Sequence, residues 1–394
     1  METQQTRPEP TVGLGMPGCS GQTVADDQIS RQLAQIWQQI LGVESITLDQ
    51  NYFDLGGDSS LAVKMFAQIE DVFKIKLPLA TLYEAPTVGE LAGILRGDIS
   101  TSQWSCLVKI QPNGTRPPFF CIHPHGGNVL VYRELSKQLG PDQPFFGLQS
   151  RGLDGSEEPL TRIEDMAKLY LTEIREAQPR GPYFLGGYCM GGAVAYEVAC
   201  QLRAAGEEVA LLALFDVMEF SKFPRASFLQ MSHYNCQRHL FHIANLLQLN
   251  SGNRSRFLSE KLRSLRVRIP VWLARVKGQL SGNTTQIGAA SEAKVLDRIW
   301  KANSQAHLNY VAKPYPGTVI DIRPCRQYRM LDHEQFKWDH LAQGGQRTIV
   351  LPVNPPAMLS DSFVRHLARA LRQCLDESIE ASLVSTNHAV PTLL

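Results

Sequence analysis

Apolar and polar positions divide the chain into regions of different character. Residues 1–24 are rich in Pro, Gly, Thr and Gln without a regular apolar period, which predicts a flexible tail. Further on, "ISRQLAQIWQQIL", "SSLAVKMFAQIEDVF" and "TVGELAGILR" carry apolar residues at helical spacing. One face of the first predicted helix is formed by Ile29, Leu33, Ile36 and Ile40. The pattern predicts a small all-α bundle over residues 25–97.

A polar linker at 98–107 separates this bundle from a region in which short apolar runs alternate with amphipathic stretches. The runs are "PFFCIHP", "PFFGLQ", "PYFLGGYC", "VALLALFDV", "GTVIDIRP" and "RTIVLPV". Buried parallel strands have this continuous apolar character, so residues 108–380 are expected to form a mainly parallel sheet covered by helices on both faces. A long helical insertion interrupts the alternation at about 217–296, and a C-terminal tail is expected at 381–394.

Composition narrows the classes of function. The chain has 394 residues, 43% of them hydrophobic and 20% charged, which suits two globular domains. Its net charge of +1 suggests neither a nucleic acid nor a membrane surface as partner. It has no run of about 18 apolar residues and no signal-peptide core. Eight scattered cysteines without a CxxC pair or zinc-like spacing predict reduced thiols, no metal site and a cytoplasmic protein.

One charged segment stands out within the predicted insertion. Residues 253–278 contain eight Lys or Arg and one Glu, whereas 25–97 contains ten Asp or Glu and five Lys or Arg. Two interpretations stay open: a solvated helix face, or a surface that docks the acidic bundle of the same chain.

The segment "YFDLGGDSSLAVKM" (52–65) is the first candidate site. Spacing alone would allow an ordinary helix N-cap at Asp58 or Ser59. The segment closely resembles the attachment site of acyl and peptidyl carrier proteins, in which "LGGDS" carries phosphopantetheine on its serine. That resemblance covers the whole bundle and implies 4'-phosphopantetheine on Ser59, with Ser60 the less favoured neighbour. A helix start suits a phosphodiester, because its free N–H groups and dipole favour an anion.

The segment "FLGGYCMGG" (184–192) has the pattern of a strand, a tight turn and a helix. Gly187 and Gly191 flank Cys189 in the G-x-nucleophile-x-G arrangement of the α/β-hydrolase elbow, where small neighbours allow a strained turn. The alternative for any lone cysteine is an inert, small apolar side chain, and the other seven cysteines are interpreted in that way. For Cys189 the surrounding pattern favours a nucleophile.

The loop "CIHPHGGNVLVYREL" (121–135) resembles the first-strand loop of type I thioesterases from nonribosomal peptide and polyketide synthetases, and the likeness extends over about 108–375. It implies an oxyanion hole formed by the backbone N–H groups of His125 and Met190. The rings of His123 and His125 are then interpreted as parts of the loop rather than as bases. Asp216, at the end of "LLALFDV", takes the place of the triad acid, with a helix cap as the alternative.

The chain departs from this family at the catalytic histidine. In "LPVNPPAML" (351–359), Pro355 occupies the histidine's place, so the triad base is expected to be absent. A serine without a base is a poor nucleophile, whereas a thiol has a pKa of about 8.5, which a helix start should lower further. Cys189 is therefore expected to attack a thioester unaided. Substitute bases are His233, His239, His242, His333 and His340, of which His242 is the first to test, although a histidine there is more often structural.

Together these features predict a carrier–thioesterase didomain with a cysteine nucleophile. The acyl or peptidyl chain would move from the Ser59 arm to Cys189 and then leave to water or another nucleophile. The missing histidine favours transfer or slow release over rapid hydrolysis. A phosphopantetheinyl transferase, upstream synthetase modules and other carrier proteins are the implied partners. Two alternatives stay open: an acyltransferase that shuttles the chain between carriers, and a non-catalytic carrier platform with a degenerate hydrolase domain. The acyl substrate itself is not encoded in any motif.

Overall fold

A computed structural model describes the chain over residues 28–57, 59–99, 104–217, 227–250, 254, 257–258, 287–328 and 338–388. The predicted tail at 1–24 and most of the basic stretch at 253–278 lie outside the described residues, so the docking role considered for that stretch stays a prediction.

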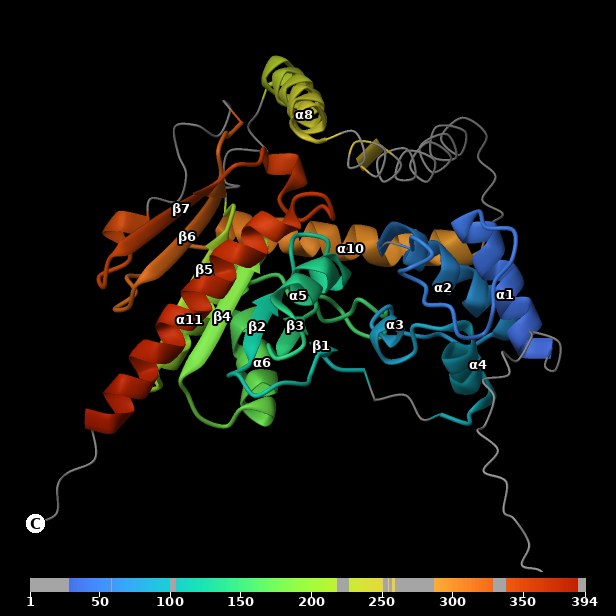
Figure 1. Cartoon of the computed structure of the whole chain (residues 1–394), viewed down its shortest axis with the longest axis horizontal. Helices are drawn as coiled ribbons and strands as arrows, with labels where there is room; N and C mark the ends of the chain where they lie inside the picture. The colour runs from blue at the N-terminus through green and yellow to red at the C-terminus, as the bar shows by residue number, and fades with distance from the viewer. Residues whose placement is uncertain are drawn as a thin grey trace, which may run out of the picture.

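The N-terminal part is a helical bundle, as predicted (Figure 1). Its helices are α1 (Gln28–Leu41), α2 (Ser59–Phe73), α3 (Thr81–Glu84) and α4 (Val88–Arg96). Helix α3 is a single turn that the apolar pattern did not reveal. A capping box between Thr87 and Glu90 starts α4, and Gly97 ends it with a positive φ of 83°. The bundle core centres on Leu33, Trp37 and Met65, all 0% exposed.

The rest of the chain is built on one seven-stranded sheet of order β1-β3-β2-β4-β5-β6-β7. The strands are β1 (Leu107–Gln111), β2 (Phe119–Ile122), β3 (Phe145–Leu148), β4 (Tyr183–Tyr188), β5 (Val209–Phe215), β6 (Val319–Pro324) and β7 (Gln346–Leu351). Strands β2 to β7 are the six predicted apolar runs and pair in parallel. Strand β1 was not predicted: it lies at the sheet edge, begins within the expected linker and pairs antiparallel to β3.

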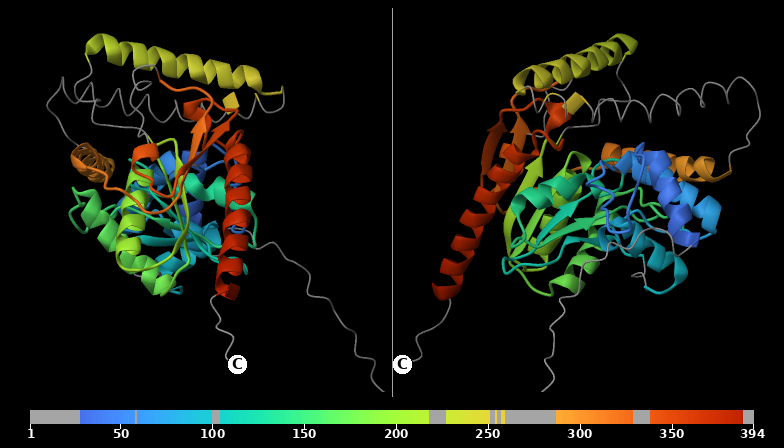
Figure 2. Two further views of the ribbon diagram at one scale, coloured as in Figure 1. Left: turned by 90° about the vertical axis from the view of Figure 1, so that its left-hand side faces the viewer. Right: turned by 45° about the vertical axis from the view of Figure 1, so that its right-hand side comes forward.

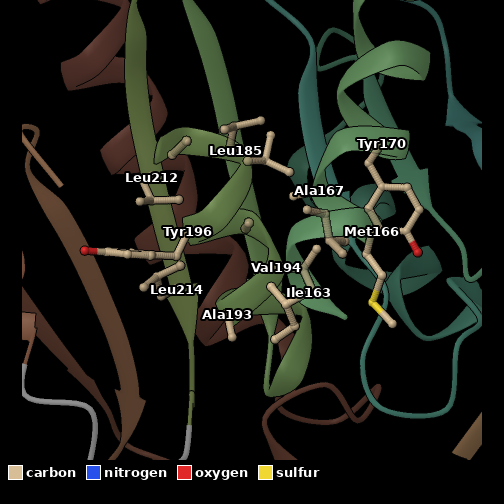
Figure 3. Close-up of a cluster of buried hydrophobic side chains, with 14 of the residues drawn as sticks. Ile163, Met166, Ala167, Tyr170, Leu185, Ala193, Val194, Tyr196, Leu212 and Leu214 are labelled. Atoms are coloured by element: carbon tan, nitrogen blue, oxygen red, sulfur yellow. The ribbon is translucent and has the colours of Figure 1, made fainter. Parts of the chain in front are cut away.

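Helices cover both faces of this sheet (Figure 2, left). One face carries α6 (Ile163–Ala177) and α7 (Met190–Ala204), and the other carries α5 (Arg133–Leu139) and α11 (Val364–His388). Figure 3 shows the first layer, where Met166 and Tyr170 of α6 and Tyr196 of α7 pack together with Leu185 of β4. Helix α11 continues to His388, into the segment that was expected to be a tail.

Two further helices lie within or extend beyond the predicted helical insertion at about 217–296. Helix α8 (Phe228–Gln248) lies beyond the end of the sheet, and α10 (Ile287–Asn309) extends from the sheet to the helical bundle (Figure 1). Helix α10 runs past the expected end of the insertion near residue 296 and packs against both α2 and α7. Among the described residues, no helix combines the length and apolar character needed to cross a bilayer.

Candidate active site

Cys189 occupies the turn between β4 and α7, as the elbow pattern predicted. It has a φ of 56° and a ψ of −124°, a backbone conformation that L-residues rarely adopt. Its backbone N–H donates to the carbonyl oxygen of Phe215 at 2.9 Å, which ties the elbow to the end of β5. The strained turn therefore places the thiol at the carboxyl end of the parallel strands, where ligands bind in α/β folds.

Glycine is required on both sides of this turn. A Cβ atom on Gly187 would overlap the backbone of Gly191, and a Cβ on Gly191 would overlap the carbonyl oxygen of Ile122. Tyr132, which is 0% exposed, links the ends of β2 and β4 next to this turn. Its hydroxyl donates to Ile122 O at 2.6 Å and accepts from the backbone N–H of Tyr188 at 3.1 Å. The glycine pattern could be recognised in the sequence, whereas no sequence pattern indicated the role of Tyr132.

The expected lowering of the Cys189 pKa is wrong. Burial raises the pKa of this thiol to about 12, and the nearby Asp216 carboxylate raises it too. The backbone N–H of Met190, at the start of α7, lowers the pKa but does not compensate. Because the side chain is only 8% exposed, desolvation of the thiolate outweighs the helix start. The Cys189 thiol is therefore expected to be neutral at pH 7.

Asp216 follows β5 directly, and the structure brings it next to Cys189, as predicted. It also has a positive φ, 45°, and its backbone N–H donates to Ile322 O at 2.9 Å. The carboxyl group is 4% exposed. Burial, assisted by the charge of Asp321, raises its pKa from 3.8 to about 7, while Arg323 opposes the rise. A carboxyl group with that pKa exchanges protons at neutral pH.

Three tyrosines that the sequence analysis missed surround this pair. Tyr188 ends β4, Tyr234 comes from α8, and Tyr328 follows β6. The rings of Tyr234 and Tyr328 lie 4.5 Å apart, and their hydroxyl groups share a hydrogen bond. All three feel the charge of Asp216, and burial raises their pKa values. Tyr188 and Tyr234 also lie within electrostatic reach of the Cys189 thiol.

The "HPHGG" loop is held by α10. The carbonyl oxygen of His125 accepts a hydrogen bond from Asn303 Nδ2 at 2.9 Å, and its Nε2 lies 2.8 Å from Ser304 Oγ. The His125 ring also packs edge-on against Trp300, with centroids 4.3 Å apart. The ring is thus engaged with α10, which agrees with its interpretation as a loop residue whose backbone matters more.

His123 is fully buried, and its hydrogen bonds define its tautomer. Nδ1 lies 2.8 Å from the carbonyl oxygen of Pro124 and must donate to it. Nε2 lies 2.7 Å from the hydroxyl of Tyr170 and therefore accepts from it. Burial lowers the pKa of His123 to about 4. Both nitrogens are used within the loop, so His123 is unsuited to act as a base for Cys189.

Pro355 lies in the turn after β7, where the sequence placed it, as the first residue of a short helix, η5 (Pro355–Ala357). The preceding Asn354 is 1% exposed and is held by Asn245 of α8: Asn245 Oδ1 accepts from the backbone N–H and from Nδ2 of Asn354, at 3.1 and 3.0 Å. An amide pair thus joins this turn to α8.

The candidate substitute bases are less favourable. His233 and His239 are exposed on α8, His340 is exposed, and His333 lies outside the described residues. His242 is half-buried on α8, the helix that packs against η5. The Asp216 carboxylate raises the pKa of the Cys189 thiol, the backbone of Met190 lowers it, and Tyr188 and Tyr234 also lie within electrostatic reach of the sulfur. Asp216 is thus a titratable group beside the sulfur with a pKa near neutrality.

Ser59 is the first residue of α2, a 15-residue helix, at the end of the Gly56–Gly57 turn. Gly56 has a φ of 88°, and a Cβ on Gly57 would overlap the ring of Tyr52. A helix start with its free N–H groups fits the phosphate of a phosphopantetheine ester. Asp58 lies outside the described residues.

Comparison with known proteins supports this organisation. The model of the phosphopantetheine attachment site matches residues 31–95, and the model of the thioesterase domain matches residues 117–227. The malpinin synthetase of Mortierella alpina is 41% identical over 190 residues, which are 48% of this chain and 2% of that protein. The dimodular nonribosomal peptide synthase of Bacillus subtilis is 40% identical over 184 residues, 47% of this chain and 8% of that protein.

A solved structure covers nearly the whole chain. The holo form of a four-domain nonribosomal peptide synthetase, bound to AMP and glycine, superposes with a TM-score of 0.53 and 26% identity. The match covers 93% of this chain and 27% of that one. This chain therefore spans only a small part of the relatives that it matches. It carries a phosphopantetheine carrier domain followed by a thioesterase domain, and is a carrier–thioesterase didomain of the nonribosomal peptide synthetase type.

Proposed function

We propose that an acyl or peptidyl chain carried on Ser59 is transferred to Cys189 as an acyl-enzyme thioester and then released or passed on. The phosphopantetheine arm supplies the thiol that holds this chain as a thioester. The observation that carries the proposal is the buried pair of Cys189 and Asp216 at adjacent strand ends, with the backbone N–H of Met190 directed at the sulfur.

Asp216 is the proposed proton acceptor. Its carboxylate takes the thiol proton as Cys189 Sγ attacks the acyl carbonyl carbon, and returns the proton to the departing sulfur when the old carbon–sulfur bond breaks. The exchange of one thioester for another is nearly balanced in energy. A pKa near neutrality lets Asp216 serve in both directions. His242 is the second candidate for the base, because its helix, α8, packs on the η5 turn.

The backbone N–H groups of Met190 and His125 are the proposed oxyanion donors. Asn303 supports this role by holding the carbonyl oxygen of His125. Helices α8 and α10 are the proposed lid, because they contribute Tyr234 and Asn303 to the surroundings of the site. The proposed domain limits are 25–97 for the carrier and 108–380 for the thioesterase.

The second half-reaction favours an acceptor better than water. Hydrolysis needs a base for water, and Asp216 beside Cys189 already serves as the proposed proton acceptor of the first step. Transfer to a thiol or amine makes smaller demands. Slow release or transfer, with a carrier protein or another nucleophile as acceptor, therefore fits the site better than rapid hydrolysis.

Intact-mass spectrometry of the phosphopantetheinylated protein tests this proposal. Candidate acyl groups are loaded on Ser59, and the thioesterase domain is examined for a second adduct over time. We expect an adduct in the wild type that is absent from Cys189→Ala while Ser59 stays loaded. An unchanged Cys189→Ala pattern would exclude Cys189 as the acceptor.

One observation favours a second candidate, a non-catalytic carrier platform: the raised pKa of Cys189 together with Pro355 at the histidine position. In that case Ser59 loads normally, and no adduct forms on the thioesterase domain at any pH between 6 and 9. The same mass measurement separates the two candidates.

A further inference from the structure

The attachment loop of the carrier contacts the thioesterase domain through Arg133. The Arg133 guanidinium lies over the ring of Phe53, 4.2 Å from its centroid, and its Nη2 is 3.5 Å from Asp54 Oδ1. Glu134 holds the other side of the guanidinium, with its carboxylate 2.6 Å from Nη1. Arg133 thus contacts an aromatic and an acidic side chain that are adjacent in the carrier sequence.

Apolar and polar contacts next to Arg133 extend this surface. Leu130 is 6% exposed and packs in the apolar core of the carrier, although it belongs to the thioesterase domain. In return, Tyr83 of the carrier packs against the thioesterase core, and its hydroxyl donates to the carbonyl oxygen of Val129 at 3.3 Å. The Arg133 charge therefore acts beside a desolvated contact and not in open water.

A second contact joins α2 to α10. It is incompletely packed: a cavity of about 30 Å³ lies between the domains, lined by Val63 and Leu79 of the carrier, Trp104 of the linker, Leu153 of the thioesterase domain, and Val295 of α10. Such a cavity holds about one water molecule.

The chain positions of these residues connect the contact to the chemistry. Phe53 and Asp54 belong to the loop that leads into α2 and Ser59. Arg133 begins α5, shortly after the "HPHGG" loop. The contact therefore joins the segment carrying the attachment serine to the segment that continues from the proposed oxyanion loop.

We propose that Arg133 is a docking residue by which the thioesterase domain selects its own carrier as acyl donor, through the adjacent aromatic and acidic side chains of Phe53 and Asp54. This proposal rests on the proposed function and names its donor. Docking raises the local concentration of the loaded arm at Cys189 and adds nothing to the chemistry of a small thioester that diffuses in freely.

The magnitudes suggest a kinetic effect and not a stable lock. Asp54 is 67% exposed and Arg133 is 22% exposed, so the ion pair alone contributes little. The cation–π contact with Phe53 is better shielded and contributes more. Reversing the charge at Arg133 removes both contacts and places two carboxylates near each other, for which we expect about a tenfold slower transfer from Ser59.

The test compares Arg133→Glu with Lys137→Glu in the full chain. Lys137 is exposed on the same helix one turn further on, so the control makes the same change of charge. Single-turnover transfer from loaded Ser59 to Cys189 is followed by intact mass, beside acylation of Cys189 by an acyl N-acetylcysteamine thioester. We expect Arg133→Glu to slow the first reaction only, and Lys137→Glu to change neither.

Hydrogen–deuterium exchange of the unloaded full chain gives a readout that is independent of activity. Peptides covering 51–57 are expected to exchange faster in Arg133→Glu than in the wild type or in Lys137→Glu. Asp54→Lys, a change at an exposed carrier position, is expected to act in the same direction with a smaller effect. The double variant Arg133→Glu with Asp54→Lys should recover part of the transfer rate.

Equal transfer rates and equal exchange in Arg133→Glu and Lys137→Glu would overturn the docking role. Failure of the proposed function has a different signature: neither donor acylates Cys189 in any variant. Exchange at 51–57 still decides the docking role in that case, because it requires no loaded arm.

Discussion

The two candidate reactive residues occupy the same kind of position with different consequences. Ser59 and Cys189 both stand at the start of a 15-residue helix, α2 and α7. For Ser59 the group at the helix start would be a phosphodiester, which is always ionised, so the helix start can only assist it. The Cys189 thiol can be neutral or ionised, and burial favours the neutral form by raising its pKa to about 12.

A helix start alone therefore does not make a site for an anion, because the surroundings of the helix start also determine whether the charged form is stable. Helix α7 is buried along most of its length, and Cys189 at its start is only 8% exposed. Desolvation of a thiolate under such conditions exceeds the stabilisation that a few backbone N–H groups provide. The thiol at this elbow is therefore neutral at rest, and the proposed reaction needs Asp216 to accept its proton.

The largest effect is expected when Cys189 is made to resemble Ser59. Cys189→Ser should slow acylation by a small thioester on the order of 1,000-fold, because a hydroxyl is far harder to ionise than a thiol and the site has no histidine partner in the expected position. Intact-mass time courses measure the rate. Cys236→Ser, at an exposed position of α8, is the matched control and should leave it unchanged. A serine variant as fast as the wild type would contradict the importance of the sulfur.

The next effect concerns the base. If Asp216 accepts the proton, acylation of the wild type rises with pH through about 7, where the carboxyl group loses its proton. Asp216→Asn should lose this step and be about 100-fold slower at pH 8. Acylation rates between pH 5.5 and 9 provide the profile. A step at the same pH in the variant would assign the base to another group, and His242→Gln would be the variant to examine next.

Asp216 should also make a measurable contribution to stability. Its pKa in the fold is about 7 against 3.8 as a free group, so the folded protein retains a proton that the unfolded chain has lost. Stability from this group is therefore greatest below about pH 4 and is lost as the pH rises to 7. Asp216→Asn should be more stable than the wild type by on the order of 4 kcal/mol at pH 8, with little difference at pH 4.

Urea unfolding at both pH values measures this difference. Asp142→Asn supplies a control of opposite sign, because hydrogen bonds from Thr115 lower the pKa of Asp142. Its replacement should destabilise the protein at neutral pH. A stability gain for Asp216→Asn that is equal at pH 4 and pH 8 would mean that its cause is not ionisation.

The smallest effect is expected at the support of the oxyanion loop. Asn303→Leu removes the hydrogen bond to His125 O and should slow acylation about tenfold. Alkylation of Cys189 by iodoacetamide needs no oxyanion hole and should keep its rate, which a general loss of structure would not allow. Equal losses in both reactions would assign Asn303 a purely structural role.

Sequence patterns predicted the fold where one local property determines it. Strands β2 to β7 are continuous apolar runs because each is covered on both faces. Strand β1, "LVKIQ", was missed because only Val108 is buried and the run is short and mixed. Helix α3 was missed because a single turn has no measurable period. The end of α10 depends on its contacts with α2 and α7, which no local pattern contains.

The candidate site also combines features that short sequence motifs predict with features that depend on distant segments. The positions of Cys189 and Asp216 follow from short motifs at the ends of β4 and β5. The direction of the Cys189 pKa does not, because burial dominates it and arises from the packing of segments that are distant in sequence. The pairing of Asn245 with Asn354 and the contact of Arg133 with Phe53 also join remote segments.

In the elbow, the flanking glycines determine the shape of the turn, and residue 189 determines its reactivity. Gly187 and Gly191 permit the turn, since any larger residue there would collide with the backbone, whereas residue 189 adopts its positive φ with a side chain present. A single codon change between serine and cysteine can therefore alter the reagent while the architecture stays intact. A fold of this kind can acquire new acyl chemistry without a change in the residues that form the turn.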